Sequence, residues 1–360
     1  MSGVLFSQSG VADPYALYAS RLRDGAVQYD SAAGVWAVYS YAGCKAVLAS
    51  PDAHVPRAAL EGLRDEAALI GGQLVRLANP PSHATLRAVA QRLFDRLRGG
   101  GIARLTDRLL REQAREFDWV TVCKRLPPLA LMDGLGFAAS SIAMLSPHID
   151  VLAKLMQPAK PAALLADLQE SAKACWPVLQ TEAARLTGKS DEAAAANLAG
   201  LLIQSYDATR GLLSNALLSA LALPAPPASA AAWRALAQET LRHDPPIHNT
   251  RRTLAAPMEI GGVPLQAGEP LLLVLAAANR DPSVFAQPEV FDWRRENAAM
   301  HLTFGFGAHG CLAREYAVLL AAEALARLFA AGPVRLAQRD IRHAPLVNAR
   351  LPEALRIRTG

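Results

Sequence analysis

Apolar residues recur at helical spacing through most of the middle of the chain. Alanine-rich stretches with this spacing dominate residues 83–240, whereas strand-like runs are confined to residues 26–40, residues 258–275 and the C-terminal tail. The breaker-rich segment LPAPPASAAA (223–232) is too short to separate domains, so it predicts a loop between helices. The pattern therefore predicts a mostly α fold with small β-sheets, formed as a single domain over residues 1–360.

The run VWAVY (35–39) is rich in β-branched and aromatic residues and is predicted to be a strand. Successive side chains of a strand point to opposite faces. One face therefore carries Trp36 and Val38, and the other carries Val35, Ala37 and Tyr39. Neither set is polar, so the pattern leaves open which face is buried.

Composition and charge exclude several classes of protein. The chain has 52% hydrophobic residues and a net charge of +5 without a block of like charges, which argues against a nucleic-acid-binding tail. The longest apolar run, LLLVLAAA (271–278), is far too short to span a bilayer. The N-terminal MSGVLFSQSGVADPY lacks the basic and apolar regions of a signal peptide. We therefore expect a soluble, cytoplasmic protein with no nucleic-acid or membrane partner.

The four cysteines, Cys44, Cys123, Cys175 and Cys311, are scattered, which disfavours a disulfide framework or a structural zinc site. Cys311 differs in its surroundings, because HLTFGFGAHGCLARE (301–315) is a glycine-rich loop that leads into an apolar helical pattern over residues 311–332. A sulfur at a helix N-terminus is favoured as thiolate. On these residues alone, three interpretations of Cys311 stay open: a buried structural cysteine, a catalytic nucleophile, or a ligand of haem iron.

The segment FGFGAHGCLAR (304–314) resembles the haem-binding loop of the cytochrome P450 family, whose pattern is Phe-Gly-x-Gly-x-His-x-Cys-x-Gly. Phe304, Gly305, Gly307, His309 and Cys311 match this pattern, and Ala313 replaces its last glycine. The order of further motifs extends the resemblance over residues 12–358. It implies a P450-like fold in which haem b lies between a long central helix and the cysteine loop, with the Cys311 thiolate on the iron and Phe304, Gly305 and His309 among the haem-binding residues.

The resemblance also implies a structural ion cluster. AQETLRHDPPIHNTRR (237–252) is similar to the family's K helix, with Glu239 and Arg242 as its Glu-x-x-Arg pair. Glu and Arg three residues apart are common on exposed helices, but Leu236 and Leu241 give this helix an apolar side. The third member of the cluster resembles Arg295 rather than Arg294. We expect these residues to hold the cysteine loop.

Groups that bind the two haem propionates are implied in the same way. NPPSHATLRAVAQRLF (79–94) is similar to the start of the family's C helix, and His83 and Arg87 are four residues apart, hence on one face. Arg252 follows Arg242 by ten residues, where the family has another propionate arginine, and His309 is the fourth donor. Four donors suit two carboxylates.

The chain departs from the family in LLIQSYDATRGLLSNAL (201–217), which takes the place of the long central I helix. Against the usual Ala-Gly-x-Asp/Glu-Thr, the chain has Gln204, Ser205, Tyr206, Asp207 and Ala208, so the acid is kept and the alcohol is lost. Thr209 lies about 100° further around the helix. The position of Gln204 resembles the one over the iron, where the amide could hydrogen-bond oxygen or water, ligate the iron, or turn away if the helix is shifted.

These resemblances imply a haem-thiolate monooxygenase that oxidises a small or medium organic molecule, in secondary metabolism, with electrons from a ferredoxin or flavodoxin. Asp207 would act as the proton-relay acid, and the segment 146–169 resembles a compact lid. The expected substrate wall is polar and consists of Gln204, Ser205, His248, Asn249 and Thr250. The altered I helix keeps two alternatives open: a haem-thiolate enzyme with peroxide-driven, coupling or dehydration chemistry, and a non-catalytic haem-binding protein.

Overall fold

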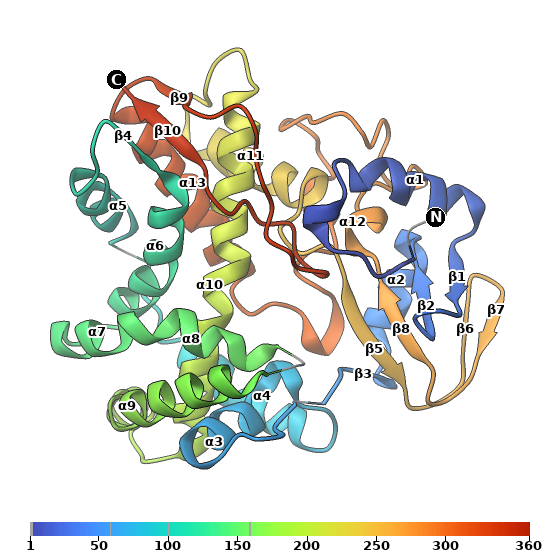
Figure 1. The fold of residues 1–360 in the computed structure, drawn as a ribbon, viewed down its shortest axis with the longest axis horizontal. Helices are drawn as coiled ribbons and strands as arrows, with labels where there is room; N and C mark the ends of the chain where they lie inside the picture. The colour runs from blue at the N-terminus through green and yellow to red at the C-terminus, as the bar shows by residue number, and fades with distance from the viewer. Residues whose placement is uncertain (1–2, 58, 100, 158–159) are drawn as a thin grey trace. The chain divides into compact units, whose positions relative to one another are not determined.

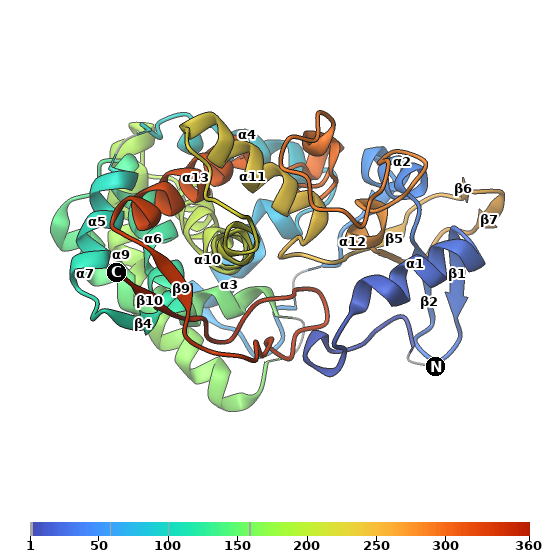
Figure 2. The ribbon, with the colours of Figure 1, turned by 90° about the horizontal axis from the view of Figure 1, so that it is seen from above.

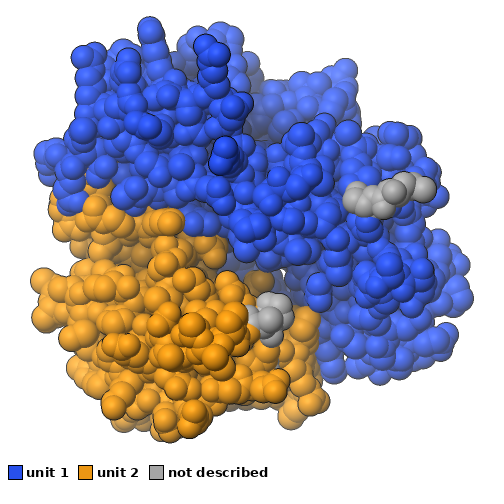
Figure 3. All heavy atoms as spheres, in the orientation of Figure 1, with its two compact units in different colours: residues 1–54, 110–123, 208–360 blue, residues 55–109, 124–207 orange. Residues whose placement is uncertain are grey.

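The computed structural model describes residues 3–57, 59–99, 101–157 and 160–360. Helices dominate the described residues and the strands are short, so the predicted fold class is confirmed (Figure 1). The chain forms two compact units, each discontinuous in sequence (Figure 3). Unit 1 comprises residues 1–54, 110–123 and 208–360, and unit 2 comprises residues 55–109 and 124–207. The single domain expected over residues 1–360 stays a prediction.

Unit 1 contains a five-stranded sheet in the order β1-β2-β8-β5-β3. Its strands are β1 (Val27–Asp30), β2 (Val35–Val38), β8 (Pro270–Leu273), β5 (Thr250–Leu254) and β3 (Ala53–His54). The pair β2 and β8 is parallel, and the other neighbours are antiparallel. The sheet is therefore mixed, with the strands predicted from residues 26–40 beside those from the later part of the chain.

Both faces of strand β2 are buried. Val38 belongs to one apolar cluster, against which Trp36 packs, whereas Val35, Ala37 and Tyr39 belong to a second cluster. The two sets are the ones that the alternation predicts. The sequence could not show which face of this strand is buried, because both faces belong to the hydrophobic core.

Two smaller sheets complete the β-structure of unit 1. Strands β4 (Glu116–Asp118), β10 (Arg356–Thr359) and β9 (Val334–Leu336) form one of them, next to helix α13 in both views of the ribbon (Figures 1 and 2). Strands β6 (Met258–Ile260) and β7 (Val263–Leu265) form a hairpin. Its turn is made by Gly261 and Gly262, both with positive φ, as a tight two-residue hairpin turn requires.

The helices of unit 1 are positioned by caps and by packing. They are α1 (Pro14–Asp24), α2 (Tyr41–Ala49), α11 (Ala230–His243), α12 (Leu275–Ala278), α13 (Arg314–Ala330), and the short 3-10 helices η1 (Gln8–Gly10), η5 (Ala298–Met300) and η6 (Gly307–His309). Asp13, Ser40 and Ser229 cap α1, α2 and α11 by accepting backbone N–H bonds. Helices α11 and α13 pack together, which brings the predicted Glu-x-x-Arg helix beside the helix that follows Cys311.

Unit 2 is helical and centres on α9 (Ala162–Thr187), which contacts α3 (Asp65–Gln73), α4 (Ser82–Phe94), α7 (Ala139–Leu145) and α8 (Ile149–Ala153). Its 3-10 helices are η2 (Val75–Leu77), η3 (Ser146–His148) and η4 (Lys154–Met156). The segment predicted to be a lid thus contains η3, α8, η4 and the start of α9, while residues 158 and 159 lie outside the described residues.

Three helices contain residues of both units: α5 (Ile102–Arg111), α6 (Trp119–Gly134) and α10 (Glu192–Leu221). The last is the long helix predicted from residues 201–217, and it runs without a break. It ends before LPAPPASAAA, and α11 begins at Ala230 within that segment. The predicted loop between helices is therefore shorter than its sequence suggested, because Ser229 starts α11 early. Among the described residues, no helix is both long and apolar enough to cross a bilayer.

Candidate active site

Cys311 lies in a tight loop, three residues before helix α13 begins at Arg314. The backbone N–H of Cys311 donates to Phe304 O at 2.8 Å, which closes the loop around η6. The helical pattern predicted to start at Cys311 therefore starts later, because the loop uses the backbone of Cys311 for its own closure. The side chain of Cys311 is exposed.

Two glycines give this loop its shape. Gly305 and Gly307 have φ of 68° and 65°, a region that side-chain-bearing residues rarely adopt. A Cβ on Gly307 would also lie 2.7 Å from Leu48 O at the end of α2. Helix α2 approaches the loop so closely that only glycine fits at this position.

Asn279 ties the loop to helix α11, and sequence reasoning missed it. Its Oδ1 accepts from Leu302 N at 2.7 Å, and its Nδ2 donates to Thr303 Oγ1 at 2.8 Å and to Leu241 O at 3.3 Å. Asn279 is fully buried. The signal in the sequence was one amide residue directly after the apolar run 271–278.

Glu239, Arg242 and Arg295 form one buried ion cluster. Arg242 Nη2 lies 2.6 Å from Glu239 Oε1, and Arg295 Nε lies 3.3 Å from the same oxygen. The side chains of Glu239 and Arg242 are 0% exposed. Both guanidinium groups also donate to backbone carbonyls of the loop 286–290, with Arg242 Nη1 2.8 Å from Pro288 O and Arg295 Nη1 2.7 Å from Ala286 O.

Arg294 takes no part in this cluster, and its guanidinium lies 4.4 Å from the centre of the Trp293 ring. The structure thus brings together the three residues that the resemblance selected. Charges that are removed from water are stable only when they are paired and hydrogen-bonded. Here the Glu239 carboxylate pairs with both guanidinium groups, and each of these also donates to backbone carbonyls. The cluster lies in unit 1 with the cysteine loop.

The remaining haem-binding candidates of unit 1 are Arg252 and His309. Arg252 lies on β5, is 6% exposed, and donates through Nη1 to Thr250 Oγ1 at 3.2 Å and to Arg251 O at 2.7 Å. His309 lies in η6 and is half-buried. Phe304, also half-buried, has its ring centre 5.3 Å from that of His301.

His83 and Arg87 belong to unit 2, where both lie on helix α4. Burial lowers the pKa of His83, and the charge of Arg87 lowers it further, which agrees with two neighbouring side chains on one face. His83 is 7% exposed. The structure therefore bears out the predicted helix and the shared face within this unit.

The I-helix candidates follow one another on α10. Gln204 Nε2 donates to Gly200 O at 2.9 Å and Ser205 Oγ donates to Leu202 O at 2.7 Å, so both side chains bond back to their own helix. Asp207 and Ala208 are half-buried, whereas Thr209 is 8% exposed. Gln204 and Ala208 are four residues apart and share a face, and Thr209 is rotated from Ala208 by about 100°.

The three wall candidates of unit 1 follow the end of α11. Asn249 donates through Nδ2 to Val347 O at 2.9 Å, and Thr250 begins strand β5. His248 is 0% exposed, and its two ring nitrogens face the hydroxyl groups of Tyr15 and Tyr18. Its side chain thus belongs to an internal hydrogen-bond network, a placement that the sequence did not suggest.

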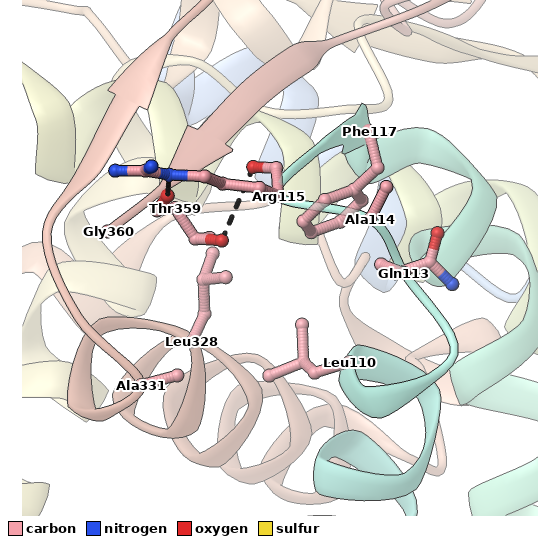
Figure 4. A pocket seen from close by; sticks show the side chains of 9 residues that line it. All are labelled: Leu110, Gln113, Ala114, Arg115, Phe117, Leu328, Ala331, Thr359 and Gly360. Carbon is pink, nitrogen blue, oxygen red and sulfur yellow. Dashed lines mark hydrogen bonds between the residues drawn. The ribbon is translucent and has the colours of Figure 1, made fainter.

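A cavity of about 420 Å³ opens elsewhere in unit 1 (Figure 4). Its lining consists of Leu110, Gln113, Ala114, Arg115, Phe117, Leu328, Ala331, Thr359 and Gly360. Arg115 Nε donates to Thr359 O at 3.1 Å along one side. None of the lining residues is a predicted haem or substrate residue, so this cavity is separate from the candidate site.

His301, at the start of the cysteine loop, makes the fold sensitive to acid. Thr303 N donates to His301 Nδ1 at 3.2 Å, and His301 Nε2 faces Gln238 Oε1 at 3.1 Å, so the neutral ring has its hydrogen on Nε2. Burial lowers the pKa of His301 to about 3, and the charges of Arg314 and Arg242 add to this. Protonation would place a second N–H against that of Thr303.

We therefore expect the free energy of unfolding to fall as the pH drops below about 6.5. The unfolded chain binds a proton near pH 6.5 and the folded chain only near pH 3, so the loss begins at the upper value and ends at the lower one. His301 alone should remove about 1 kcal/mol between pH 6.5 and pH 5.5. Urea unfolding at several pH values measures the slope, which should be smaller in His301→Gln. An equal slope in both proteins would contradict the assignment.

The structure thus has an exposed thiol on a glycine-shaped loop, and Asn279 joins this loop to the helix that carries the buried Glu239–Arg242 pair, as the resemblance to cytochromes P450 predicts. Residues 233–330 match the family model described as Cytochrome P450. The putative cytochrome P450 YjiB of Bacillus subtilis is 28% identical over 354 residues, covering 89% of this chain and 87% of the relative. These matches confirm the resemblance to the cytochrome P450 family that the motifs predicted.

Two further comparisons differ in how much of the chain they cover. The putative cytochrome P450 140 of Mycobacterium bovis is 39% identical over 127 residues, which cover 34% of this chain, and the match spans only 29% of that relative's length. The crystal structure of CalO2 has a TM-score of 0.82 at 22% identity and covers 99% of each chain. This likeness shows that the fold extends over nearly the whole chain.

The cytochrome P450 resemblance implies a haem held by a thiolate, and the cysteines of this chain fit that group. Cys44, Cys123 and Cys175 are 0% exposed. Burial raises the pKa of the Cys175 thiol to about 12 and raises those of Cys44 and Cys123 as well, so these three thiols stay protonated. Cys311 is the exposed member of the four, and the interpretation of it as a buried structural cysteine is wrong.

Proposed function

We propose that the protein is a haem-thiolate monooxygenase that oxidises a small or medium organic molecule. The observation that carries the proposal is the exposed Cys311 thiol on a loop that Asn279 ties to helix α11, the helix that also carries the buried Glu239–Arg242 pair. A haem bound through this thiolate would supply iron that activates oxygen, with the thiolate donating electron density. Within a cytoplasmic enzyme of secondary metabolism, the protein then has to bind haem, orient substrate and deliver protons.

The proposed haem-binding residues are cations and donors matched to two carboxylates. Arg252 and His309 in unit 1, and His83 and Arg87 in unit 2, would bind the propionates. Arg252 suits this role because its cationic side chain is almost fully buried at 6% exposure, on strand β5. Phe304 and Gly305 would pack against the haem.

Proton delivery is where this chain differs from its family. Asp207 is the proposed relay acid, and Ala208 supplies no hydroxyl beside it. Gln204 uses Nε2 within its own helix, which leaves Oε1 as the atom that can accept from a water or a bound ligand. With Ser205, Asn249 and Thr250 it would present hydrogen-bonding groups to a polar substrate, whereas the side chain of His248, predicted as part of this wall, is buried behind it.

The electron donor in this proposal is a ferredoxin or a flavodoxin. The surface around the cysteine loop offers positive charge next to exposed apolar surface. Lys45 Nζ lies 5.1 Å from the ring centre of Phe306, which is 40% exposed, and Arg314 at the start of α13 is exposed as well. Such a patch suits a small acidic protein.

Product analysis tests the proposal. Purified protein is supplied with candidate substrates and either a surrogate ferredoxin system or hydrogen peroxide alone. A monooxygenase gives hydroxylated product with the ferredoxin system, whereas product with peroxide alone supports the second candidate, a peroxide-driven enzyme, which the missing hydroxyl at Ala208 favours. Product in neither arm, in protein with full haem content, would contradict both and leave a haem-binding protein.

Gln204→Ala should uncouple electron use from product formation. If the amide replaces the missing alcohol, its removal should raise the peroxide yield per electron, and Gln204→Ala/Ala208→Thr should restore coupling, while Ala208→Thr alone changes little. If the amide instead ligates the iron, the resting protein should be low-spin and Gln204→Ala should make it high-spin. The absorbance spectrum and the peroxide yield of the three variants decide between these roles. No change in either quantity would mean that Gln204 points away from the haem.

A further inference from the structure

Five polar side chains of unit 1 form one unbranched chain of hydrogen bonds. Gln8 Nε2 donates to the Tyr18 hydroxyl at 3.2 Å, and that hydroxyl lies 3.0 Å from His248 Nδ1. On the other side of the ring, the Tyr15 hydroxyl lies 3.3 Å from His248 Nε2 and donates to the Asp244 carboxylate. Gln8, Tyr18 and His248 are 1%, 4% and 0% exposed, so most of this chain is closed to solvent.

The donors and acceptors fix the direction of this hydrogen-bond chain. An ionised carboxylate only accepts, so the hydrogen of the Tyr15 hydroxyl goes to Asp244 and the Tyr15 oxygen accepts from His248 Nε2–H. At the other end the Tyr18 oxygen accepts from Gln8, and the Tyr18 hydrogen goes to Nδ1. His248 is therefore neutral, with its hydrogen on Nε2.

The charges around the ring agree with a neutral His248. Burial lowers the pKa of His248 well below its usual value, and the neighbouring Arg350, Arg280 and His343 lower it further. Burial and the Asp244 carboxylate raise the pKa of Tyr15, although the Arg280 guanidinium, 3.6 Å from the ring centre, opposes this. Neither the ring nor the phenol changes its charge near neutral pH.

The backbone at His248 leads directly to the proposed substrate wall. His248 N donates to Asn348 O at 2.9 Å, and His248 O accepts from Ala276 N at 3.0 Å. The next two residues are Asn249 and Thr250. A shift of the imidazole ring would therefore move the backbone from which both wall side chains project.

The N-terminal segment that carries the tyrosines is fastened to the same region. Gln8 N donates to Leu346 O at 2.8 Å. The buried Arg350 donates through Nη1 to Gln8 O at 3.1 Å and through Nη2 to Ala12 O at 3.0 Å. Residues 8–12, which lead into helix α1, are thus held by contacts without the tyrosine hydroxyls against residues 346–350, the segment that also accepts the backbone bond from His248 N.

We infer that Tyr15 and Tyr18 are positioning residues, which act through His248 to fix Asn249 and Thr250 at the substrate wall. The side chain of His248 then serves the reaction from behind the wall rather than by touching substrate. The inference rests on the proposed function, because it assumes that residues 249 and 250 face the substrate. Removing one tyrosine hydroxyl from the hydrogen-bond chain leaves a buried ring nitrogen of His248 without its partner. Because an unpaired buried nitrogen costs free energy, we expect the ring to shift toward another partner.

Two haem ligands of different size test this inference. Imidazole and 4-phenylimidazole both bind ferric haem through a ring nitrogen, but only the phenyl group extends to the wall. Tyr18→Phe and Tyr15→Phe should raise the Kd of 4-phenylimidazole at least threefold and leave the Kd of imidazole unchanged. The control is Tyr39→Phe, because Tyr39 is also buried at 3% exposure and its hydroxyl is not part of the hydrogen-bond chain. Equal ratios of the two Kd values in all four proteins would overturn the inference.

A conservative replacement and a spectrum separate positioning from general stability. His248→Gln keeps one donor and one acceptor and should keep the 4-phenylimidazole Kd within twofold, whereas His248→Leu should weaken it even if both have the same Tm. Nitrogen-15 NMR of the purified protein should show His248 with its hydrogen on Nε2, and hydrogen on Nδ1 would overturn the assignment. This NMR spectrum does not depend on activity. If the protein lacked the absorbance spectrum of a thiolate-ligated haem, the proposed function would be contradicted, but the position of the hydrogen on His248 would still be measured.

Discussion

Cys311→Ser should abolish the red-shifted Soret band that a thiolate-ligated haem shows after reduction and addition of carbon monoxide. A serine hydroxyl has nearly the size of a thiol, but it stays neutral near pH 7 and is a poor replacement for a thiolate ligand. The loop should keep its shape, because its closing bond from Cys311 N to Phe304 O uses the backbone alone. The absorbance spectrum and the haem content per chain measure the result.

Cys44→Ser is the matched control for this change. Cys44 is fully buried, and its Sγ donates to Val38 O at 3.3 Å, a bond that a hydroxyl can also make. The variant should keep the haem spectrum of the wild type. A normal thiolate spectrum in Cys311→Ser, or its loss in Cys44→Ser alone, would mean that another group ligates the iron.

Glu239→Ala should prevent the accumulation of folded, haem-containing protein. Removing the carboxylate leaves Arg242, which is 0% exposed, without its charge partner, and it also takes an acceptor from Arg295. Breaking a buried pair in this way costs about 3–5 kcal/mol, a large part of the 5–15 kcal/mol that typically separates folded from unfolded states. The yield of monomeric protein and its urea midpoint measure the effect.

The chain contains an exposed cluster of the same design, which serves as the control. Glu116 holds Arg356 at 2.9 Å and Arg358 at 2.7 Å, but the two arginine side chains are 62% and 63% exposed. Water screens such pairs, so Glu116→Ala should leave the urea midpoint close to that of the wild type. Equal effects of the two alanine variants would show that burial of the Glu239 cluster does not matter for folding.

The sequence by itself predicts where the chemistry lies, because that prediction depends on local patterns. The glycines around Cys311, the spacing of Glu239 and Arg242, and the lost hydroxyl at Ala208 can all be read without a fold. The strand at residues 35–39 and its two faces could be predicted as well, because alternation is a property of the extended backbone. Local spacing did not reveal that both faces are buried, which depends on elements far away in the chain.

Contacts between segments that are distant in sequence decided which side chains are buried and which groups they bond. Asn279 joins α11 to the cysteine loop over 38 and 23 residues of sequence, and its place after the apolar run 271–278 does not reveal which groups it bonds. His248 looked like a wall residue, yet Tyr15 and Tyr18, more than 200 residues earlier, enclose its ring. The sequence predicted Cys311 as the iron ligand and Glu239 and Arg242 as an ion pair, since short spacings carry both signals. Only the tertiary structure decided which polar side chains lie inside, because burial and hydrogen-bond partners arise when segments remote in sequence pack together.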